Sequence, residues 1–443
     1  MSENMKPSGI TWIGDIPGSW EVKRIKHCCP NIGSGTTPES SNLDYYDGEI
    51  NWIQSGDLYE RDVITTTEKT ITQLALNSYT ALKLYVADYV VVAMYGASVG
   101  NVATSKIDAC VNQACCVLTP GNSNDIRFLY YWLVLCKEDL IQQSFGGGQP
   151  NISQEKIKNE PMLSLPLFEQ TLIADFLDKQ CAKIDSIATD IEKQIEILQK
   201  YKKSLITETV TKGLDKTVHV KESGIAAIGL INESYVISKL KYIVVTPITD
   251  GPHETPILLD EGVPFLSAEA VRNERLEFEN KRGYISEADH EMYCKKCKPQ
   301  RNDIFMIKSG ATTGNIALVD TDEEFSVWSP LALIRCDNIQ IKQKFIFYSM
   351  LSDYFSKNVE LSWSYGTQQN IGMGVIGNLQ IVLPSSNEQT QIVNYLDKKC
   401  LKIDSIIESK KEQLTHITQH KKSLIYEYVT GKKRVKGAYN NGN

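Results

Sequence analysis

The chain has 443 residues, 42% of them hydrophobic, and a formal net charge of −7. This length predicts two or three domains, and no apolar run approaches the ~20 residues of a membrane span. The N-terminus lacks a charged segment followed by an apolar one, and adjacent cysteine pairs suit a disulfide framework poorly. We therefore expect a reduced, cytoplasmic protein, in which any nucleic-acid-binding face is local because the chain as a whole is acidic.

The first globular segment is predicted to mix strands and helices, with strands dominant. After a turn-rich loop at 33–38, GSGTTP, an Asp47–Gly48 turn precedes alternating, strand-like residues at 50–53. Further strands are expected within 84–103, interrupted at Gly96 and Gly100, and at 111–120. A helix is predicted over 126–143, followed by a Gly-rich loop at 144–153. These elements predict an α+β domain.

A long helix follows, and its sequence occurs twice. Residues 169–211 and 388–430 align without a gap at an offset of 388 − 169 = 219, sharing EQT, LDK and KKSLI. The absence of Pro and Gly favours a helix, and the heptad spacing of apolar residues predicts a coiled-coil seam about 60 Å long. Lys410 interrupts the second seam. The predicted seam residues are Leu177, Ile184, Ile191, Leu198, Leu205, Leu396, Ile403, Ile417 and Leu424. A second apolar row includes Ile187.

The second globular segment repeats the order of the first. Residues 223–241 resemble 8–26, and strands are expected within 261–271, 301–319 and 325–336, with a helix over 341–358. We therefore divide the chain into domain 1 at 1–168, helix at 169–213, domain 2 at 214–387, helix at 388–432, and a basic and polar tail at 433–443.

These motifs, in this order and twice, resemble the specificity (S) subunit of Type I restriction–modification enzymes. The resemblance rests on GTTP followed by DGEINWIQSGDL, GASVGN at 96–101 and GATTGN at 310–315, Asn112–Gln113, and the long helix entered through Pro shortly before EQ. It implies two target-recognition domains, each reading one half of a split double-stranded DNA site, and two helices that pair antiparallel. Ser329–Pro330 stands where Asn112–Gln113 is expected in the second half.

The resemblance also implies partners and a non-catalytic role. It implies docking of two methyltransferase (M) subunits, which bind S-adenosylmethionine, and through them of restriction (R) subunits. We expect no cofactor and no metal on this chain. It lacks a glycine-rich cofactor loop and the Asn/Asp-Pro-Pro-aromatic motif of adenine methylation. GASVGN and GATTGN lack the lysine of a phosphate-binding P-loop. They fit tight turns or backbone close to DNA phosphate.

Three stretches are candidates for DNA contact. Small side chains and backbone N–H groups at 34–37 suit phosphates, amide and carboxylate groups at 54–57 suit base edges, and 295–301 is basic. The residues are Ser34, Gly35, Thr36, Thr37, Gln54, Ser55, Asp57, Lys295, Lys296, Lys298 and Arg301. Next to the third stretch, His290, Cys294 and Cys297 have partial zinc-ligand spacing without a fourth ligand nearby.

Two other classes of function remain open on the sequence alone. One is a self-sufficient nuclease or methyltransferase, which the absent catalytic motifs disfavour. The other is a coiled-coil scaffold with two protein- or glycan-binding domains, which the absence of a neighbouring methyltransferase gene would favour.

Overall fold

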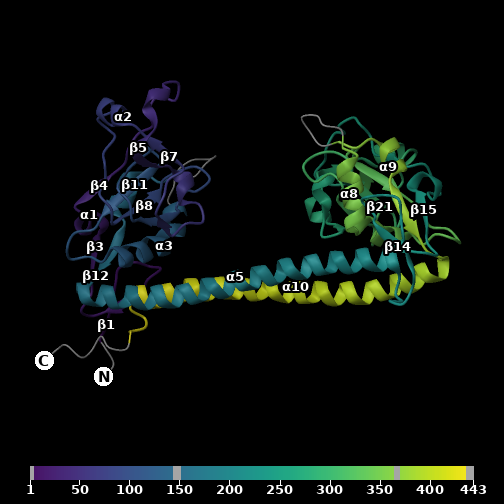
Figure 1. Cartoon of the computed structure of the whole chain (residues 1–443). Helices are drawn as coiled ribbons and strands as arrows, with labels where there is room; N and C mark the ends of the chain where they lie inside the picture. Colours follow the sequence, from purple (N-terminus) through teal and green to yellow (C-terminus); the bar gives the residue numbers. More distant parts are fainter. Residues whose placement is uncertain (1–3, 143–150, 364–369, 436–443) are drawn as a thin grey trace. The chain divides into compact units, whose positions relative to one another are not determined.

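The computed structural model describes residues 4–142, 151–363 and 370–435; residues 144–150 of the predicted Gly-rich loop and 436–443 of the tail lie outside them. The chain forms two compact units, unit 1 from residues 1–191 and 413–443 and unit 2 from 192–412. Two long helices, α5 (Leu167–Lys212) and α10 (Ser386–Val429), each contribute one half to either unit. Figure 1 shows α5 in blue to teal and α10 in yellow-green to yellow. Each unit therefore combines a globular part with two helix segments.

Unit 1 contains a five-stranded sheet and a three-stranded sheet. The first has the order β4-β11-β8-β9-β6 and the second β10-β5-β7, in which β5 and β10 are parallel. Trp52, Tyr89 and Trp132 are all fully buried, each in a different hydrophobic cluster of unit 1. The bounds of the five-stranded sheet are β4 Asn31–Gly33, β11 Cys115–Thr119, β8 Tyr89–Ala93, β9 Val102–Ser105 and β6 Val63–Ile64. The remaining elements are β10 Ala109–Val111, β5 Tyr46–Ile53, β7 Lys69–Ile71, β1 Met5–Pro7 paired with β2 Asp15–Pro17, β3 Glu21–Arg24 paired with β12 Pro161–Ser164, and the helices α1 Ile25–Cys28, α2 Gln73–Ser78, α3 Ile126–Gln142 and α4 Gln154–Asn159.

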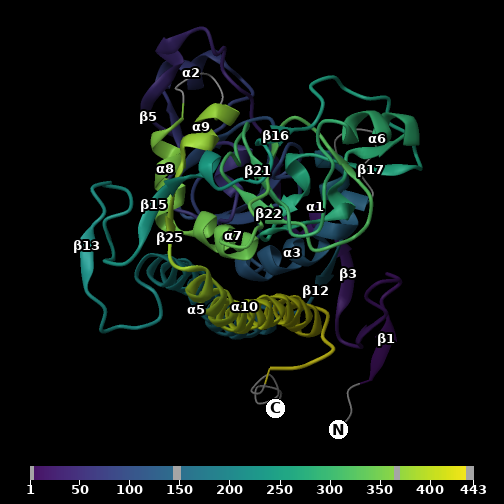
Figure 2. The same cartoon turned by 90° about the vertical axis from the view of Figure 1, so that its right-hand side faces the viewer.

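Unit 2 repeats this plan, with a six-stranded sheet β16-β24-β21-β22-β19-β18 and a three-stranded sheet β20-β17-β23 in which β17 and β23 are parallel. Helix α7 packs toward the long helices, as Figure 2 shows. The sheet strands are β16 Thr249–Asp250, β24 Leu331–Ile334, β21 Ile304–Ile307, β22 Ile316–Leu318, β19 Arg275–Leu276, β18 Val271–Arg272, β20 Gly283–Ile285, β17 Val263–Leu266 and β23 Ser326–Val327. The other elements are β13 Val220–Glu222 paired with β14 Leu230–Asn232, β15 Val236–Lys239 paired with β25 Gln380–Leu383, and the helices α6 Glu287–Cys294, α7 Gln343–Leu351, α8 Asp353–Leu361 and α9 Met373–Asn378.

The predicted α+β class is confirmed, but three predicted elements are wrong in detail. The single strand expected at 111–120 is two strands, because the Asn112 side chain accepts a hydrogen bond from the Ala114 N–H (3.0 Å) and closes a turn. The strand expected within 325–336 divides in the same way into β23 and β24. The helix expected at 341–358 breaks at Ser352, whose side chain caps α8.

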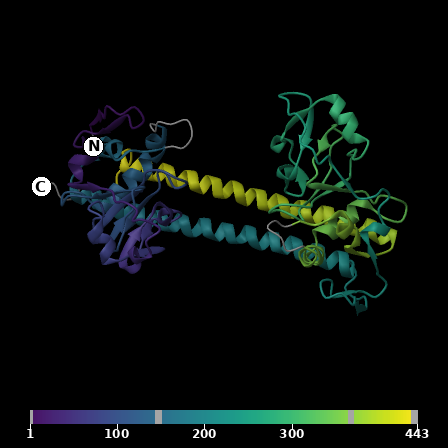
Figure 3. The same ribbon diagram turned by 90° about the horizontal axis from the view of Figure 1, so that it is seen from above.

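Within each unit the two long-helix segments run antiparallel, side by side as seen from above in Figure 3. In unit 1, Asp185 of α5 pairs with Lys421 of α10 at 2.7 Å. In unit 2, Lys202 of α5 pairs with Asp404 of α10 at 3.0 Å. These two ion pairs are copies of each other, since 202 + 219 = 421 and 185 + 219 = 404. The repeat thus places the same contact in both units. No helix within the described ranges has the length and apolar composition of a membrane span.

The predicted seam residues are covered to different degrees. Leu177 shares a hydrophobic cluster with Leu424 in unit 1, and Leu205 shares one with Leu396 in unit 2. The side chain of Ile187 is 51% exposed, because this position does not follow the alternating three- and four-residue spacing of the covered seam positions. Among the predicted residues, the buried ones are Leu177, Ile191, Leu396 and Ile403, and the half-buried ones are Ile184, Leu198, Leu205, Ile417 and Leu424.

The glutamine of the repeated EQT motif joins each long helix to its globular part. Gln170 is 1% exposed; its amide donates to the carbonyls of Leu165 (2.8 Å) and Ser123 (3.1 Å), and its oxygen accepts from the Asp125 N–H (3.0 Å). Gln389 makes the same three contacts in unit 2, with Pro384, Gln340 and Lys342. All three hydrogen bonds of each buried amide are made with backbone groups, and together they fix the start of the long helix.

Candidate nucleic-acid interface

In unit 1, loops after four strands meet at one edge of the sheets. The parallel strands β5 and β10 end together at Ile53 and Val111, and the Asn112 N–H donates to the Ile53 carbonyl (2.9 Å). The neighbouring loop after β8 is joined to this turn, because the Met94 N–H donates to the Ala114 carbonyl (2.7 Å). Carboxyl ends of parallel strands leave loops at the same edge, where ligands of such sheets commonly bind. We call the loops that follow β4, β5, β8 and β10 the loop cluster of unit 1.

The predicted phosphate-contacting loop at 34–37 lies against the same turn. The Gly35 N–H points to the Asn112 carbonyl (3.4 Å), and the Tyr85 hydroxyl donates to the Ser34 carbonyl (3.2 Å). A side chain at position 35 would place its Cβ 1.7 Å from the Val111 carbonyl oxygen, so only glycine allows this approach. Residues 34–37, Ser34, Gly35, Thr36 and Thr37, are all half-exposed. The structure therefore brings this loop to the loop cluster.

Gln113 is an exposed amide at the centre of the cluster that sequence reasoning did not select as a site residue. The Thr37 hydroxyl donates to its side-chain oxygen at 2.6 Å, and the side chain of Tyr95 also hydrogen-bonds with it. An amide held this way presents its remaining donors in a fixed direction, and glutamine amides pair with the adenine edge in the major groove. The signal that identifies it is the Asn112–Gln113 motif together with the GTTP loop.

The second predicted stretch, 54–57, also reaches the cluster, but its three residues differ in availability. The Ser98 hydroxyl donates to the Ser55 carbonyl (2.7 Å), which ties this stretch to the GASVGN loop. The side chains of Gln54 and Ser55 are half-exposed. Asp57 is 4% exposed, and its carboxylate accepts from the N–H groups of Gln54 (2.8 Å) and Glu68 (3.0 Å). In this structure Asp57 therefore holds the loop rather than presenting a carboxylate to a base.

Unit 2 builds the same cluster with different side chains. The Trp328 N–H donates to the Leu266 carbonyl (2.9 Å), as Asn112 does to Ile53, and the Lys308 N–H donates to the Pro330 carbonyl (2.8 Å), as Met94 does to Ala114. A Cβ on Gly251 would lie 1.8 Å from the Val327 carbonyl oxygen, matching Gly35. These hydrogen bonds align Trp328–Ser329 with Asn112–Gln113. The predicted alignment of Ser329–Pro330 with Asn112–Gln113 is therefore wrong by one residue, because the two segments share no side chain by which the sequences could be aligned here.

The cluster of unit 2 is charged where that of unit 1 is neutral. Asp250 is fully buried and pairs with Lys296 (2.5 Å), Lys308 (2.9 Å) and His253 (3.2 Å). Burial alone would raise the pKa of Asp250, but Lys296 and Lys308 outweigh it and lower that pKa. Asp250 thus stays ionised and anchors two lysines, so the two lysines and one carboxylate together carry an excess positive charge. A local excess of positive charge of this kind is what DNA binding by an acidic chain would require.

The predicted basic stretch 295–301 is only partly joined to this cluster. Lys296 reaches it through Asp250 and through the Gly251 carbonyl (3.1 Å). Lys295 and Lys298 are exposed, and Arg301 pairs with Asp322 at 2.5 Å. The sulfur of Cys294 lies 3.6 Å from His290 Nε2, and Cys297 is 3% exposed with a pKa that burial raises to about 12. Within the described residues, no group of three or more His, Cys, Asp or Glu residues is placed to hold a metal ion.

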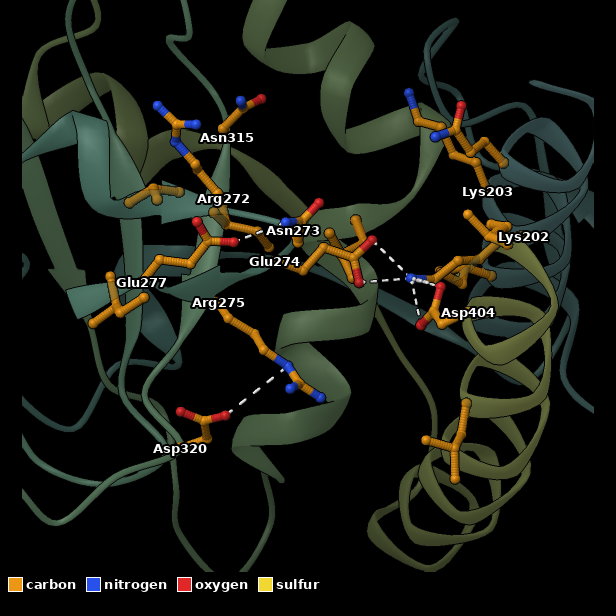
Figure 4. Close-up of a pocket in the computed structure, with 18 of the residues that line it drawn as sticks. Lys202, Lys203, Arg272, Asn273, Glu274, Arg275, Glu277, Asn315, Asp320 and Asp404 are labelled. Atoms are coloured by element: carbon orange, nitrogen blue, oxygen red, sulfur yellow. Dashed lines mark hydrogen bonds and ion pairs between the residues drawn. The ribbon is translucent and has the colours of Figure 1, made fainter. Parts of the chain in front are cut away.

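A charged pocket of about 960 Å³ in unit 2 separates strands β18 and β19 from the long helices. Figure 4 shows Lys202 reaching across it to Glu274 and Asp404, at 2.8 and 3.0 Å. Lys202 is 9% exposed. Its contacts tie the globular part of unit 2 to both long helices. Basic and acidic side chains alternate around this pocket, so its lining does not favour a ligand of either charge. We therefore interpret its ion pairs as structural.

Comparison with known proteins gives consistent matches over the chain. The family described as "Type I restriction modification DNA specificity domain" matches residues 17–197 and 253–416. The chain is 26% identical to the Type I restriction enzyme MjaVIII specificity subunit of Methanocaldococcus jannaschii, covering 95% of this chain and 94% of that protein. It is also 26% identical to the putative MjaX specificity subunit of the same organism, over 98% and 97%. A chain from a solved type I R-M system shares the fold, with a TM-score of 0.67, 13% identity and coverage of 94% and 99%.

Proposed function

Because the chain belongs to the Type I restriction modification DNA specificity family, we infer that it is the DNA specificity subunit of a Type I restriction–modification system. Type I specificity subunits are non-catalytic, so the chemistry belongs to partner subunits. The chain binds DNA and assembles with M and R subunits. The alternative of a protein- or glycan-binding scaffold has no support from the comparisons, and the family also argues against a self-sufficient enzyme.

We propose in addition that each globular part reads one half of a bipartite site in double-stranded DNA. The observation that carries this proposal is the repeated loop cluster. Asn112 and Trp328 make the same backbone hydrogen bond, yet their side chains and neighbours differ. Shared backbone geometry suits a common way of approaching DNA, whereas different side chains suit different bases, since base edges are read by side-chain hydrogen bonds.

The further details of assembly are also proposals. We propose that the long helices set the spacer between the half-sites and dock two M subunits, which carry S-adenosylmethionine, and that the complex works in the cytoplasm. We keep the domain limits 1–168, 169–213, 214–387, 388–432 and 433–443. The proposed DNA-contacting residues are the eleven at 34–37, 54–57 and 295–301, with Gln113 added, and Asp57 acting through the position of its loop.

An exchange of recognition domains tests the proposal. Residues 10–165 are replaced by the matching segment of a relative with a different methylated site, and the chimera is expressed with the M subunits. Methylome sequencing should show one half of the site changed and the other half retained. The unchanged chain with the same M subunits is the control. A change in both halves, or in neither, would contradict two independent readers.

A further inference from the structure

Arg282 differs from every other arginine that the structure describes. Its side chain makes no hydrogen bond or ion pair with any described residue, and it is exposed. The side chains of the other described arginines each have a polar partner, from the exposed Arg24 to the half-buried Arg335. They are Arg24, Arg61, Arg127, Arg272, Arg275, Arg301, Arg335 and Arg434. Five N–H donors of Arg282 are therefore available to a ligand.

This guanidinium is nevertheless held in place. Its central carbon lies 4.2 Å from the centre of the Trp328 ring, a cation–π distance. Trp328 itself packs against a small hydrophobic cluster of Phe265, Ile285 and Tyr293. The Arg282 N–H donates to the Phe265 carbonyl at 3.0 Å, so the backbone is fixed to the same strand. Stacking covers one face of the guanidinium and leaves the donor-bearing edge open, which pre-organises it for a planar partner.

Arg282 lies at the edge of the sheet that bears the loop cluster of unit 2. It directly precedes β20, whose Gly283 is opposite Phe265, and Trp328 directly follows β23. The Ser329 N–H donates to the Pro252 carbonyl (3.1 Å), which connects this point to the Gly251 loop. Lys296 and Lys308 of the same cluster supply positive charge close by. Phosphate attraction thus has other sources, and the arginine is free for recognition.

The matching position of unit 1 carries the opposite charge. In unit 1, Lys69 of β7 is opposite Trp52, as Gly283 is opposite Phe265 in unit 2, so Glu68 corresponds to Arg282. Glu68 is exposed. A carboxylate accepts hydrogen bonds from bases, whereas a guanidinium donates them. The side chain at this position therefore differs between the two units. Such a difference is expected of a residue that contacts bases, whereas a residue that contacts phosphate would be similar in both units.

We propose that Arg282 is a specificity-determining residue that reads a guanine in the second half-site, by donating two hydrogen bonds to O6 and N7 in the major groove. The inference rests on the proposed function. Arginine is suited to this edge because its two parallel N–H groups match the two acceptors of guanine, and no other base presents that pair. Trp328 acts as a positioning residue beneath it.

The test uses the full chain assembled with its M subunits. Methylation is measured on a set of duplexes in which each base pair of both half-sites is changed in turn. Wild type should discriminate for one G·C pair of the second half-site by roughly tenfold to a hundredfold, the range of a bidentate contact. Arg282→Lys keeps the charge but not the planar fork, and Arg282→Gln removes both. Both variants should lose discrimination at that pair alone. Arg275→Gln, an exposed arginine of the same unit, should behave as wild type.

Several outcomes would overturn the proposal. A uniform loss of methylation at every pair, with discrimination intact, would make Arg282 a phosphate contact. Unchanged specificity in both variants would exclude any reading role. Trp328→Leu provides a second measurement, with thermal unfolding compared to wild type to show that the variant is folded. A folded variant should show weaker discrimination at the same G·C pair. Retained discrimination would contradict the role of Trp328 in positioning Arg282. If wild type itself methylates no bipartite site, the proposed function fails, whatever the variants do.

Discussion

Replacement of Lys202 by Met tests whether the ion pairs of the charged pocket hold unit 2 together. Lys202 is 9% exposed and bridges Glu274 of the β18–β19 hairpin and Asp404 of α10, at 2.8 and 3.0 Å. Removal of the lysine leaves two carboxylates close together without a cation. Loss of one partner from a buried ion pair costs ~3–5 kcal/mol. The side chains of Glu274 and Asp404 are 36% and 50% exposed, so water recovers part of this cost, and we expect about 1–3 kcal/mol.

The repeat supplies a matched control in Lys421→Met. Lys421 is more exposed, at 27% of its side chain, and pairs with Asp185 alone. An exposed pair of this kind contributes about 0–1 kcal/mol. Calorimetry of the full chain measures the loss of stability, and hydrogen exchange of peptides from 192–412 assigns it to unit 2. Equal effects of the two substitutions would refute the bridging role of Lys202.

Glu274 gives a second, sharper control because its backbone is strained. Asn273 and Glu274 form the two-residue turn between β18 and β19, with φ values of 50° and 65°. A non-glycine residue in this left-handed region costs ~1–2 kcal/mol. Glu274→Gly removes both the strain and the charge, so the double variant Lys202→Met/Glu274→Gly should be more stable than Lys202→Met alone. A double variant that is no more stable would show that the orphaned carboxylate is not the cause.

The pH dependence has a definite sign. Burial by itself lowers the pKa of Lys202, but Glu274 and Asp404 outweigh it, and the pKa is raised overall. A raised lysine pKa contributes stability that is fully present below the unfolded value of ~10.4 and is lost as the pH rises through the folded value. The difference between wild type and Lys202→Met should therefore be constant from about pH 6 to 9 and shrink only in strong alkali.

Two further predictions concern the proposed DNA-contacting loop at 34–37 and the long helices. Gly35→Ala places a Cβ 1.7 Å from the Val111 carbonyl oxygen, so the loop must shift at a cost of about 1–3 kcal/mol, and methylation by the assembled complex should fall. Gly56→Ala is the control, because the space around its Cβ is open. Equal methylation activity of the two variants would contradict the close approach at Gly35. Four residues inserted after Gln194 and Gln413 add about one turn, or roughly 6 Å, to each helix. Methylome sequencing should then show the DNA spacer between the half-sites longer by about one or two base pairs. An active variant with the old spacer would show that the helices do not set its length.

Local chemistry made the helices predictable. The 219-residue offset, the absence of Pro and Gly and the heptad spacing specify two similar helices before any contact is known. The same spacing could not identify Lys202 as a seam residue, because apolar periodicity ignores charged positions. Lys202 is paired with Glu274, which is distant in sequence and reaches it from the globular part. The sequence likewise could not show Ser352 as the break between α7 and α8.

The proposed DNA-contacting site was predictable only in part, because pairing between strands distant in sequence builds it. The GTTP and QSGD stretches were identified from their side chains, and the parallel pairing of β5 with β10 is what brings both to Asn112. The sequence predicts that Asp57 contacts base edges, but its carboxylate accepts hydrogen bonds from the backbone N–H groups of Gln54 and Glu68, which local sequence does not reveal. Arg282 belongs to no motif; its distinction is a contact with Trp328, 46 residues onward by 328 − 282, that no periodicity indicates.

The discontinuous make-up of unit 1 has a consequence for how the protein is made. Unit 2 is one continuous stretch, 192–412, whereas unit 1 needs the segment of α10 that starts at residue 413, which is synthesised after all of unit 2, to cover the helix that follows its own globular part. During synthesis the first half of α5, including Leu177 and Cys181, must wait with its apolar face open while more than two hundred residues are added. We expect unit 2 to complete its core first. A transcript cut short after the codon for residue 412 would then yield a chain whose later-made unit is finished and whose earlier-made unit is not.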